Sequence, residues 1–139
     1  MINIKNGTES DKQRLLSKYP NLDKFFFGDG RLVIAENGNE IVGFLWAHKK
    51  KFSAPVEAEE MFINYITVFE PELRCRGIGT QMVQKIIKIA KAEQVYQIRA
   101  KVKTENVPSH RLWLKNKFSI SPAQMPDGNI AVSFVGYVL

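Results

Sequence analysis

Apolar positions recur along the chain at two spacings, and these spacings predict helices and strands over most of its length. The clearest helical pattern runs from Gly77 to about Glu93, where apolar residues recur every three or four positions and lysines and glutamines take the opposite face. Capping residues and breakers predict three shorter helices. They run from Thr8 or Ser10 to Tyr19-Pro20, over Asn21–Phe27 before Gly28-Asp29-Gly30, and from Pro108 to about Lys117.

Strands are predicted where β-branched and aromatic residues cluster between turn signals. Asn37-Gly38 is a strong signal for a two-residue hairpin between two of them. The polar segment Lys49–Glu60 predicts a mobile connection that leads to the central strand. The predicted strands are Ile2–Ile4, Arg31–Glu36, Glu40–His48, Met61–Phe69, Val95–Val102, Phe118–Ile120 and Asn129–Val138.

The order of these elements is helices, hairpin, strand, helix, strand, helix and strands, which predicts an α/β domain with a mixed sheet. The strand–helix–strand unit at Met61–Val102 should be parallel and right-handed. The chain has 139 residues and no internal repeat, low-complexity tract or linker. A chain of this length forms one hydrophobic core, so residues 1–139 are predicted to form a single domain.

Composition excludes several classes of protein. One cysteine, Cys75, rules out an internal disulfide framework. His48 and His110 have no Cys or acidic partners at zinc-like intervals, so no metal site is predicted. The sequence has no apolar run long enough to cross a bilayer, and its polar segment Met1–Lys12 is unlike a secretory leader. We therefore expect a cytoplasmic protein that binds neither metal nor membrane.

The net charge of +6 is unevenly distributed. Residues 71–117 contain eleven Lys or Arg and three acidic residues, a balance of +8, and the remainder has a balance of −2. One half of the molecule therefore favours an anionic partner, such as a phosphorylated cofactor, a nucleic acid or an anionic surface. A solvated basic face is the alternative interpretation. Nucleic-acid binding is disfavoured, because no aromatic residue accompanies the lysines on the polar face at Lys85–Lys91.

The segment that says most about chemistry is Arg74-Cys75-Arg76-Gly77-Ile78-Gly79-Thr80, between a predicted strand and a predicted helix. Its two glycines let the backbone turn tightly and approach a ligand without interference from a Cβ atom. The N–H groups of the first helical turn, the helix dipole and the two arginines then favour a pyrophosphate. The segment lacks the Gly-Lys-Ser/Thr ending of a Walker loop, and Met82 replaces the third glycine of a dinucleotide fingerprint. A glycine-containing helix start beside solvated arginines is the alternative.

The chain from Met61 to Phe118 resembles the GNAT superfamily of N-acetyltransferases. The family signature Arg/Gln-x-x-Gly-x-Gly/Ala, which follows the fourth strand, is matched by Arg74, Gly77 and Gly79. The resemblance implies an α/β (α+β) fold with a mixed, mostly antiparallel sheet of six or seven strands, about four flanking helices, and parallel fourth and fifth strands that splay apart. It also implies transfer of an acetyl group from acetyl-CoA to an amine acceptor by direct attack, without a metal.

The resemblance also assigns roles in cofactor binding. The loop Arg74–Thr80 is expected to hold the pyrophosphate of coenzyme A, and the pantetheine arm is expected to enter between the strands Met61–Phe69 and Val95–Val102. The backbone near Phe69, at the position of the family's bulge residue, should hydrogen-bond the acetyl carbonyl and stabilise the oxyanion. The cofactor-binding residues implied in this way are Val68, Phe69, Arg74, Cys75, Arg76, Gly77, Ile78, Gly79, Thr80, Asn106, Ser109 and Trp113.

The chain departs from the family at two positions where members commonly have the proton donor and the general base. The family's second block, Asn-x-x-Ala/Ser-x-x-Leu-Tyr, is matched by Asn106, Ser109 and Leu112. The tyrosine that would protonate the leaving thiolate is replaced by Trp113, whose indole N–H is no useful acid, and core packing is its alternative role. The family's glutamate base corresponds to Tyr65, a poor base that can hold a water molecule. A helix cap is the alternative role of Asn106.

Three further side chains near these blocks can titrate. His110 adjoins Ser109 and is a candidate proton relay, and a surface position is its alternative. For Glu59 and Glu60 we expect a solvated strand entrance rather than a catalytic role. The candidate catalytic residues are therefore Tyr65, Phe69 and His110.

The two departures bear on the acceptor. An amine with a pKa of about 10.4, as in lysine, is only about 0.04 % free base at pH 7, whereas an α-amine near 7.8 is about a tenth free. We therefore expect an acceptor amine of low pKa. An acyl-CoA sensor of the same fold and a nucleic-acid-binding protein are the alternatives. The apolar strand at Asn129–Val138 offers an edge that can pair across a homodimer.

Overall fold

A computed structural model describes residues 1–51, 58–103, 106–124 and 126–134 of the chain. Seven strands form one sheet in the order β1-β2-β3-β4-β5-β7-β6. Every neighbouring pair is antiparallel except β4 and β5, which are parallel as predicted. The strands are β1 (Ile2–Asn6), β2 (Asp29–Asn37), β3 (Glu40–Lys51), β4 (Glu59–Val68), β5 (Gln97–Lys103), β6 (Ser119–Gln124) and β7 (Asn129–Phe134).

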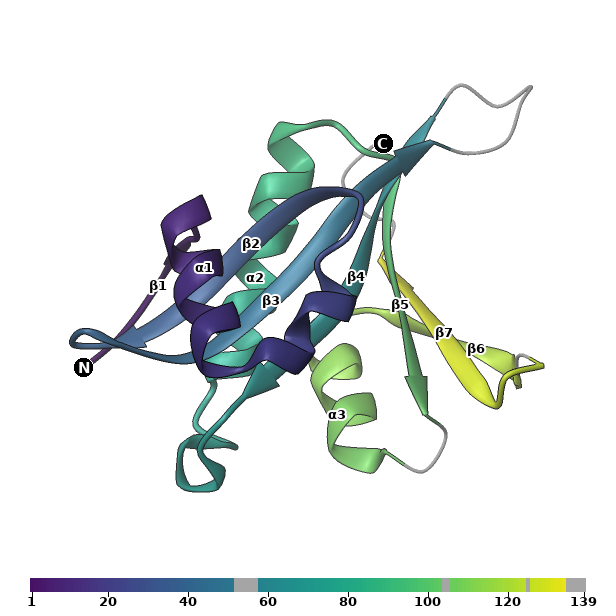
Figure 1. Ribbon diagram of the computed structural model, residues 1–139. Coiled ribbons are helices and arrows are strands. Elements are labelled where there is room, and N and C mark those ends of the chain that lie inside the picture. The colour runs from purple at the N-terminus through teal and green to yellow at the C-terminus, as the bar shows by residue number, and fades with distance from the viewer. Residues whose placement is uncertain (52–57, 104–105, 125, 135–139) are drawn as a thin grey trace.

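Helices cover both faces of the sheet (Figure 1). Helix α1 (Glu9–Lys18) and the 3-10 helix η1 (Pro20–Phe25) lie on one face, and α2 (Ile78–Ala92) and α3 (Val107–Lys115) pack on the other. A short 3-10 turn, η2 (Pro71–Leu73), leads from β4 towards α2. Within the described segments, every helix is too short or too polar to span a bilayer.

The sheet buries an apolar layer on each face. Beneath α2 and α3, side chains such as Met82 and Ile86 pack on buried residues of β2 to β5. On the opposite face, Leu15 of α1 belongs to a cluster with Phe44 and Trp46 of β3. Because successive strand residues point to opposite faces, the central strands contribute to both layers.

Helix α1 begins where the sequence provides a capping residue. The Thr8 hydroxyl accepts the backbone N–H of Asp11 at 3.2 Å, and the Asp11 carboxylate accepts the N–H of Thr8 at 2.9 Å. This reciprocal capping box satisfies two N–H groups that have no partner within the helix. Of the two predicted caps, Thr8 is therefore correct, and Ser10 lies inside the helix.

The turn of the β2–β3 hairpin lies one residue further along the chain than predicted. Asn37 pairs with Glu40, so the two central residues are Gly38 and Asn39 rather than Asn37 and Gly38. Gly38 has a φ of 63°, a left-handed conformation that costs glycine nothing, whereas Asn39 has a negative φ. Glycine at the first central position is the pattern of a type II′ turn, which suits the twist of the two strands.

Other predicted boundaries also differ. The second short helix is a 3-10 helix and ends at Phe25, before Gly28 takes a φ of 79°. The segment Lys49–Glu60 is not wholly a connection, because β3 continues to Lys51 and β4 begins at Glu59. Residues 52–57 of that segment lie outside the described residues.

The predicted C-terminal strand is present over Asn129–Phe134 as β7, and residues 135–138 of the prediction lie outside the described residues. β7 lies between β5 and β6 and pairs with both. It therefore offers no free edge over this range, and the predicted pairing of this strand across a homodimer has no basis there.

The amphipathic pattern predicted for α2 is confirmed, and an ion pair ties its end to β2. Arg31 donates two hydrogen bonds to the Glu93 carboxylate, at 2.7 and 2.6 Å, and Lys49 lies 3.5 Å from the same carboxylate. The Arg31 guanidinium holds the pKa of Glu93 below its usual range. The buried stripe of α2 consists of Ile78, Met82, Val83, Ile86 and Ala90.

This ion pair predicts a pH dependence of stability. Glu93 has a lower pKa in the folded chain than in the unfolded chain, so its contribution is complete above the unfolded value of about 4.3 and is lost as the pH falls through the folded value. We expect the urea midpoint to fall between pH 5 and pH 3, and to fall less in Glu93→Gln. An equal fall in both proteins would contradict this role of the pair.

Candidate active site

The loop before α2 supplies unpaired backbone donors. Gly77 is the N-cap of α2 with a φ of 82°, and Cys75 also has a positive φ, of 62°. No side chain caps this helix among the described residues, because its N-cap is a glycine. The N–H groups of its first turn therefore keep their capacity to bind a ligand. Together with the helix dipole they favour an anion at this point.

These donors lie at a cavity of about 390 Å³ between the end of β4, the loop and α3. A Cβ atom at Gly77 would meet open space, and a Cβ atom at Gly79 would lie 3.6 Å from Leu112, which also lines the cavity. The size and the basic lining fit a ligand that carries phosphate groups. The lining residues are Ile66, Thr67, Val68, Leu73, Arg74, Cys75, Gly77, Ile78, Gly79, Thr80, Asn106, Pro108, Ser109, Arg111, Leu112 and Lys115.

Strands β4 and β5 are paired only at their beginnings. The pairing starts at Glu60 with Gln97 and ends at Ile63 with Ala100. A β-bulge at Asn64 follows directly, where β4 has one residue more than β3, and bulges of this kind bend a strand. Beyond the bulge β4 stays paired with β3 but not with β5. The two parallel strands therefore diverge, as predicted, and leave one edge of β4 open.

The open edge of β4 presents backbone groups of Ile66 and Val68. The N–H of Phe69 donates to the carbonyl of Val42 on β3 at 2.9 Å. Backbone groups alternate in direction along a strand, so the N–H groups of Ile66 and Val68 face away from β3. The Val68 carbonyl accepts a hydrogen bond from Arg74 Nε at 3.0 Å, which joins the loop to this edge.

This geometry corrects the role predicted for Phe69. Its N–H is already engaged by β3, and its ring stacks on Tyr19 with a centroid separation of 4.3 Å, on the sheet face away from α2. The bulge is at Asn64, five residues before the predicted position. Tyr65 lies on the same face as Phe69 and stacks on Phe25 at 4.0 Å. Neither Tyr65 nor Phe69 lines the cavity.

In α3, two residues of the second family block have the alternative roles given above: Trp113 packs in the core and Asn106 caps the helix. Trp113 is 2 % exposed, lies 4.9 Å from the Phe118 ring and donates from Nε1 to the Ser109 hydroxyl at 3.2 Å. Leu112, not Trp113, lines the cavity. Asn106 caps α3 by accepting the N–H of Ser109 at 3.2 Å, and it also lines the cavity.

Two other predicted residues do not line the cavity. Arg76 is exposed and is not among its lining residues, and neither is His110 of α3. The sequence argument missed Arg111 and Lys115, which add positive charge from α3. Their spacing of four residues, with Leu112 and Pro108 on the same side, was an available signal. Among the described residues, no group of three His, Cys, Asp or Glu side chains is placed to hold a metal ion.

The structure contradicts the solvated entrance predicted for Glu60. This carboxylate is 0 % exposed, and it accepts hydrogen bonds from Arg99 Nε at 2.9 Å and from the Gln97 amide at 3.1 Å. A second nitrogen of Arg99 lies 2.8 Å from the carboxylate. Glu59 remains partly exposed and lies 3.6 Å from Lys49. A buried carboxylate requires such a partner, because an isolated buried charge is very costly.

Comparison with known proteins decides the family. The model of the Acetyltransferase (GNAT) family matches residues 3–118, most of the chain. The chain belongs to the GNAT acetyltransferase family. This GNAT protein is 30 % identical over 98 residues to an L-2,4-diaminobutyric acid acetyltransferase of Shouchella clausii, a match that covers 70 % of this chain and 51 % of the relative.

A relative of the same name in Virgibacillus pantothenticus is 33 % identical over 88 residues, which cover 63 % of this chain and 52 % of the relative. The GNAT protein thus spans about half the length of the curated relatives that it matches. Its fold is similar to that of Arabidopsis thaliana Naa50 in complex with the bisubstrate analogue CoA-Ac-MVNAL. That similarity has a TM-score of 0.75 and 17 % identity, and it covers 97 % of this chain and 99 % of the other.

Proposed function

We propose that this GNAT protein transfers the acetyl group of acetyl-CoA to an amine. The observation that carries the proposal is the cavity that connects the N-terminus of α2 with the open edge of β4. This arrangement suits a long cofactor with a diphosphate in its middle and a thioester at its end. The names of the curated relatives, and the coenzyme A conjugate held by the structural neighbour, support it.

In this proposal the diphosphate binds the N–H groups of the first turn of α2, and Arg74, Arg111 and Lys115 supply positive charge. Among the described residues, the Arg74 side chain hydrogen-bonds through Nε to Val68 alone, so its other guanidinium N–H groups can contact a phosphate. The pantetheine arm follows the open edge of β4. From Val68 back to the bulge at Asn64 this edge is about 13 Å long, at about 3.3 Å per residue.

The thioester then lies near the bulge, beside the N–H of Ile66, which faces away from β3. We assign to this N–H, in place of Phe69, the hydrogen bond to the acetyl carbonyl oxygen. A fixed donor there stabilises the oxyanion that forms when the amine attacks, and such donors contribute strongly to catalysis. The Val68 N–H is left to hold an amide of the pantetheine arm.

The acceptor enters from the opposite face of the sheet, beside η1 and Tyr65. We propose that it presents an α-amine of low pKa. The peptide portion of the analogue bound by the neighbour carries the acetyl group at its α-amine, whereas the amino acid in the names of the relatives has both an α-amine and an amine at C4. An α-amine is partly deprotonated at neutral pH, so it can attack without a strong base.

This choice of acceptor predicts a large substrate preference. At pH 7 we expect kcat/KM for a lysine-free peptide with a free α-amine to exceed that for an N-terminally blocked peptide with one lysine by about 250-fold. The ratio of free-base fractions, about 0.1 to 0.0004, is the physical reason. Release of free thiol from acetyl-CoA is the measurement. Comparable values for the two peptides would remove the preference for low-pKa amines.

The second candidate function is an acyl-CoA sensor. The thiol-release assay distinguishes it from a transferase. The buried position of Trp113 favours that candidate, because no phenol from this position reaches the cavity to protonate the thiolate. A sensor binds acetyl-CoA in a calorimetric titration but releases no thiol with any amine. Steady release with at least one amine supports the transferase.

A further inference from the structure

The Asn64 side chain at the β4 bulge links η1 to β3. Its amide nitrogen donates to the carbonyl of Phe25 at 3.0 Å, and its amide oxygen lies 2.5 Å from Nδ1 of His48. A backbone carbonyl can only accept, so the NH₂ group of Asn64 must face Phe25. The reverse orientation of the amide would place two oxygens against each other. The amide oxygen is therefore fixed towards His48.

This contact decides the tautomer of His48. An amide oxygen only accepts hydrogen bonds, so Nδ1 of His48 must carry the hydrogen and donate it to Asn64. Nε2 has no hydrogen-bond partner among the described residues, so in the neutral imidazole its lone pair can accept a proton. A histidine held at one nitrogen, with the other nitrogen open, is the arrangement that general-base catalysis needs.

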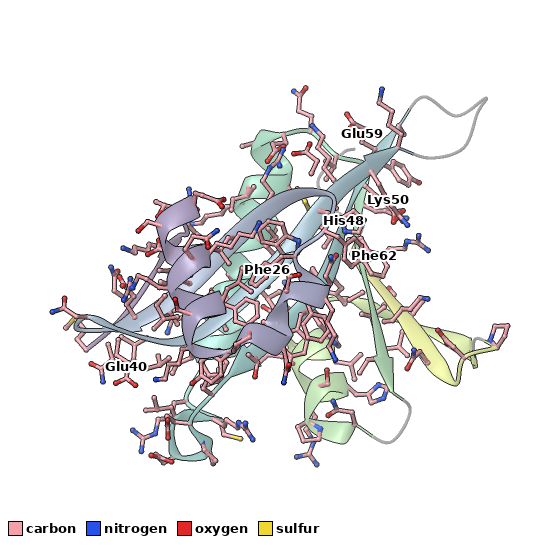
Figure 2. All side chains as sticks on the ribbon, in the orientation of Figure 1. Phe26, Glu40, His48, Lys50, Glu59 and Phe62 are labelled. Atoms are coloured by element: carbon pink, nitrogen blue, oxygen red, sulfur yellow. The ribbon has the colours of Figure 1, made fainter. Side chains whose placement is uncertain are left out.

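His48 lies beside the point where β4 and β5 diverge. Its ring is half-buried, 5.2 Å from the ring of Phe27 and 5.8 Å from that of Phe62, its partner on β4. Figure 2 shows His48, Lys50 and Phe62 together on the upper half of β3 and β4. Asn64 follows Ile63, the last β4 residue paired with β5. The imidazole is thus next to the fork where the thioester and the amine are proposed to meet.

The face of the sheet around His48 carries several charged side chains. Lys50 and Arg99 both lie over the Phe62 ring, at 5.0 and 5.9 Å, and the carboxylate of Glu60 is engaged by Arg99. Among the described residues, no carboxylate hydrogen-bonds to His48. The titratable and charged groups on this face are Lys12 of α1, Lys24 of η1, Lys50 of β3, Glu60 and Tyr65 of β4, and Arg99 of β5.

We propose that His48 is the general base of the acetyl transfer and that Asn64 is its positioning residue. This inference rests on the proposed function. Nε2 of His48 takes one proton from the ammonium form of the acceptor, directly or through one water. The amine nitrogen then bonds to the carbonyl carbon, the C–S bond breaks, and the thiolate leaves with the electron pair. The second proton lost by the nitrogen goes through solvent to the thiolate, and His48 returns its proton to solvent.

The test of the base uses His48→Gln, which keeps a polar side chain of similar length. We expect kcat/KM for the best amine to fall about 100-fold, within the range of about 10²–10⁴ for a positioned base. The acidic limb of the pH profile of kcat/KM should shift to the deprotonation of the acceptor amine itself, and the affinity for acetyl-CoA should be unchanged because His48 does not line the cavity. Free imidazole should partly restore the rate of His48→Ala.

Asn64 provides a matched pair of variants. Asn64→Asp keeps an oxygen that accepts the Nδ1 hydrogen but sets its second oxygen against the Phe25 carbonyl, so we expect it to retain more of the rate than Asn64→Leu. Asn64→Leu loses that acceptor, and we expect it to lose about 10-fold or more, up to the full effect of about 10²–10⁴-fold for loss of the base. Nitrogen NMR of the ligand-free protein should show the Nδ1–H tautomer of neutral His48 in the original chain and in Asn64→Asp.

The outcomes separate this proposal from the proposed function. Turnover that persists in His48→Gln with an unchanged acidic limb overturns the base and leaves the transferase intact. An Nε2–H tautomer in the original chain also overturns it. Acetyl-CoA binding without thiol release by the original chain, with any amine, overturns the transferase and the base together.

Discussion

Gly77→Val and Gly79→Val are expected to lower the affinity for acetyl-CoA by about 100-fold or more. Both glycines line the cavity at the N-terminus of α2. A side chain there displaces the diphosphate from N–H donors, and hydrogen bonds to charged groups contribute about 1.5–3 kcal/mol each. Loss of two such bonds corresponds to about 3 kcal/mol, or about 100-fold in affinity. Calorimetric titration with acetyl-CoA is the measurement.

The two glycines test different physical causes. Gly77 has a positive φ, so valine there also strains the backbone, whereas Gly79 does not, so valine there acts through its volume alone. Gly38→Val is the matched control, because Gly38 has a φ of 63° and lies in a distant hairpin, where an added Cβ atom would meet no other atom within 4 Å. Unchanged affinity in both Gly77→Val and Gly79→Val would place the cofactor elsewhere.

Arg99→Met is expected to lower the free energy of unfolding by about 3 kcal/mol. The substitution leaves the carboxylate of Glu60, which is 0 % exposed, without its two-nitrogen contact to Arg99. Removal of one partner from a buried ion pair costs about 3–5 kcal/mol. We expect the lower end of this range because Gln97 still bonds the carboxylate and Lys50 lies 3.9 Å away. Urea unfolding is the measurement.

Lys101→Met provides the control for this prediction. Lys101 is two residues further along β5 and pairs at 3.3 Å with Asp127, and both side chains are more than 40 % exposed. Exposed pairs of this kind contribute about 0–1 kcal/mol. The double variant Glu60→Leu/Arg99→Met should recover much of the loss, because it buries no unpaired charge. Equal losses in the free energy of unfolding for Arg99→Met and Lys101→Met would show that the buried Glu60 pair stabilises the fold no more than an exposed pair.

The loop Arg74–Thr80 shows what can be predicted from the residues of a single segment. Its glycine spacing predicts a helix that starts without a side-chain cap, and the structure has Gly77 in a left-handed conformation at that point. The hairpin shows the limit of the same reasoning. Asn37-Gly38 marks the turn, but the register of β2 and β3 decides that Gly38 and Asn39 occupy its centre. Register depends on which side chains both strands bury, which is not a local property.

The errors in the predicted site have the same origin. Counting along the sequence gives Phe69 the role of oxyanion donor, yet the strand alternation turns its N–H to Val42 and turns Ile66 and Val68 to the open edge. The one-residue bulge at Asn64 shifts this alternation, and no residue type in the segment predicts a bulge there. His48 and Asn64 come from different strands, and only their pairing brings them into contact.

By itself the sequence determined the elements, the parallel β4–α2–β5 unit and the position of the glycine-rich helix start. These features follow from spacing within one segment, through helical periodicity, capping and the freedom of glycine. The tertiary structure alone decided that Glu60 is buried against Arg99, that Trp113 belongs to the core, and that His48 is held by Asn64. Each of these contacts joins residues whose neighbours in space are set by strand order and register, because burial and hydrogen bonding depend on the packing partner and not on the residue alone.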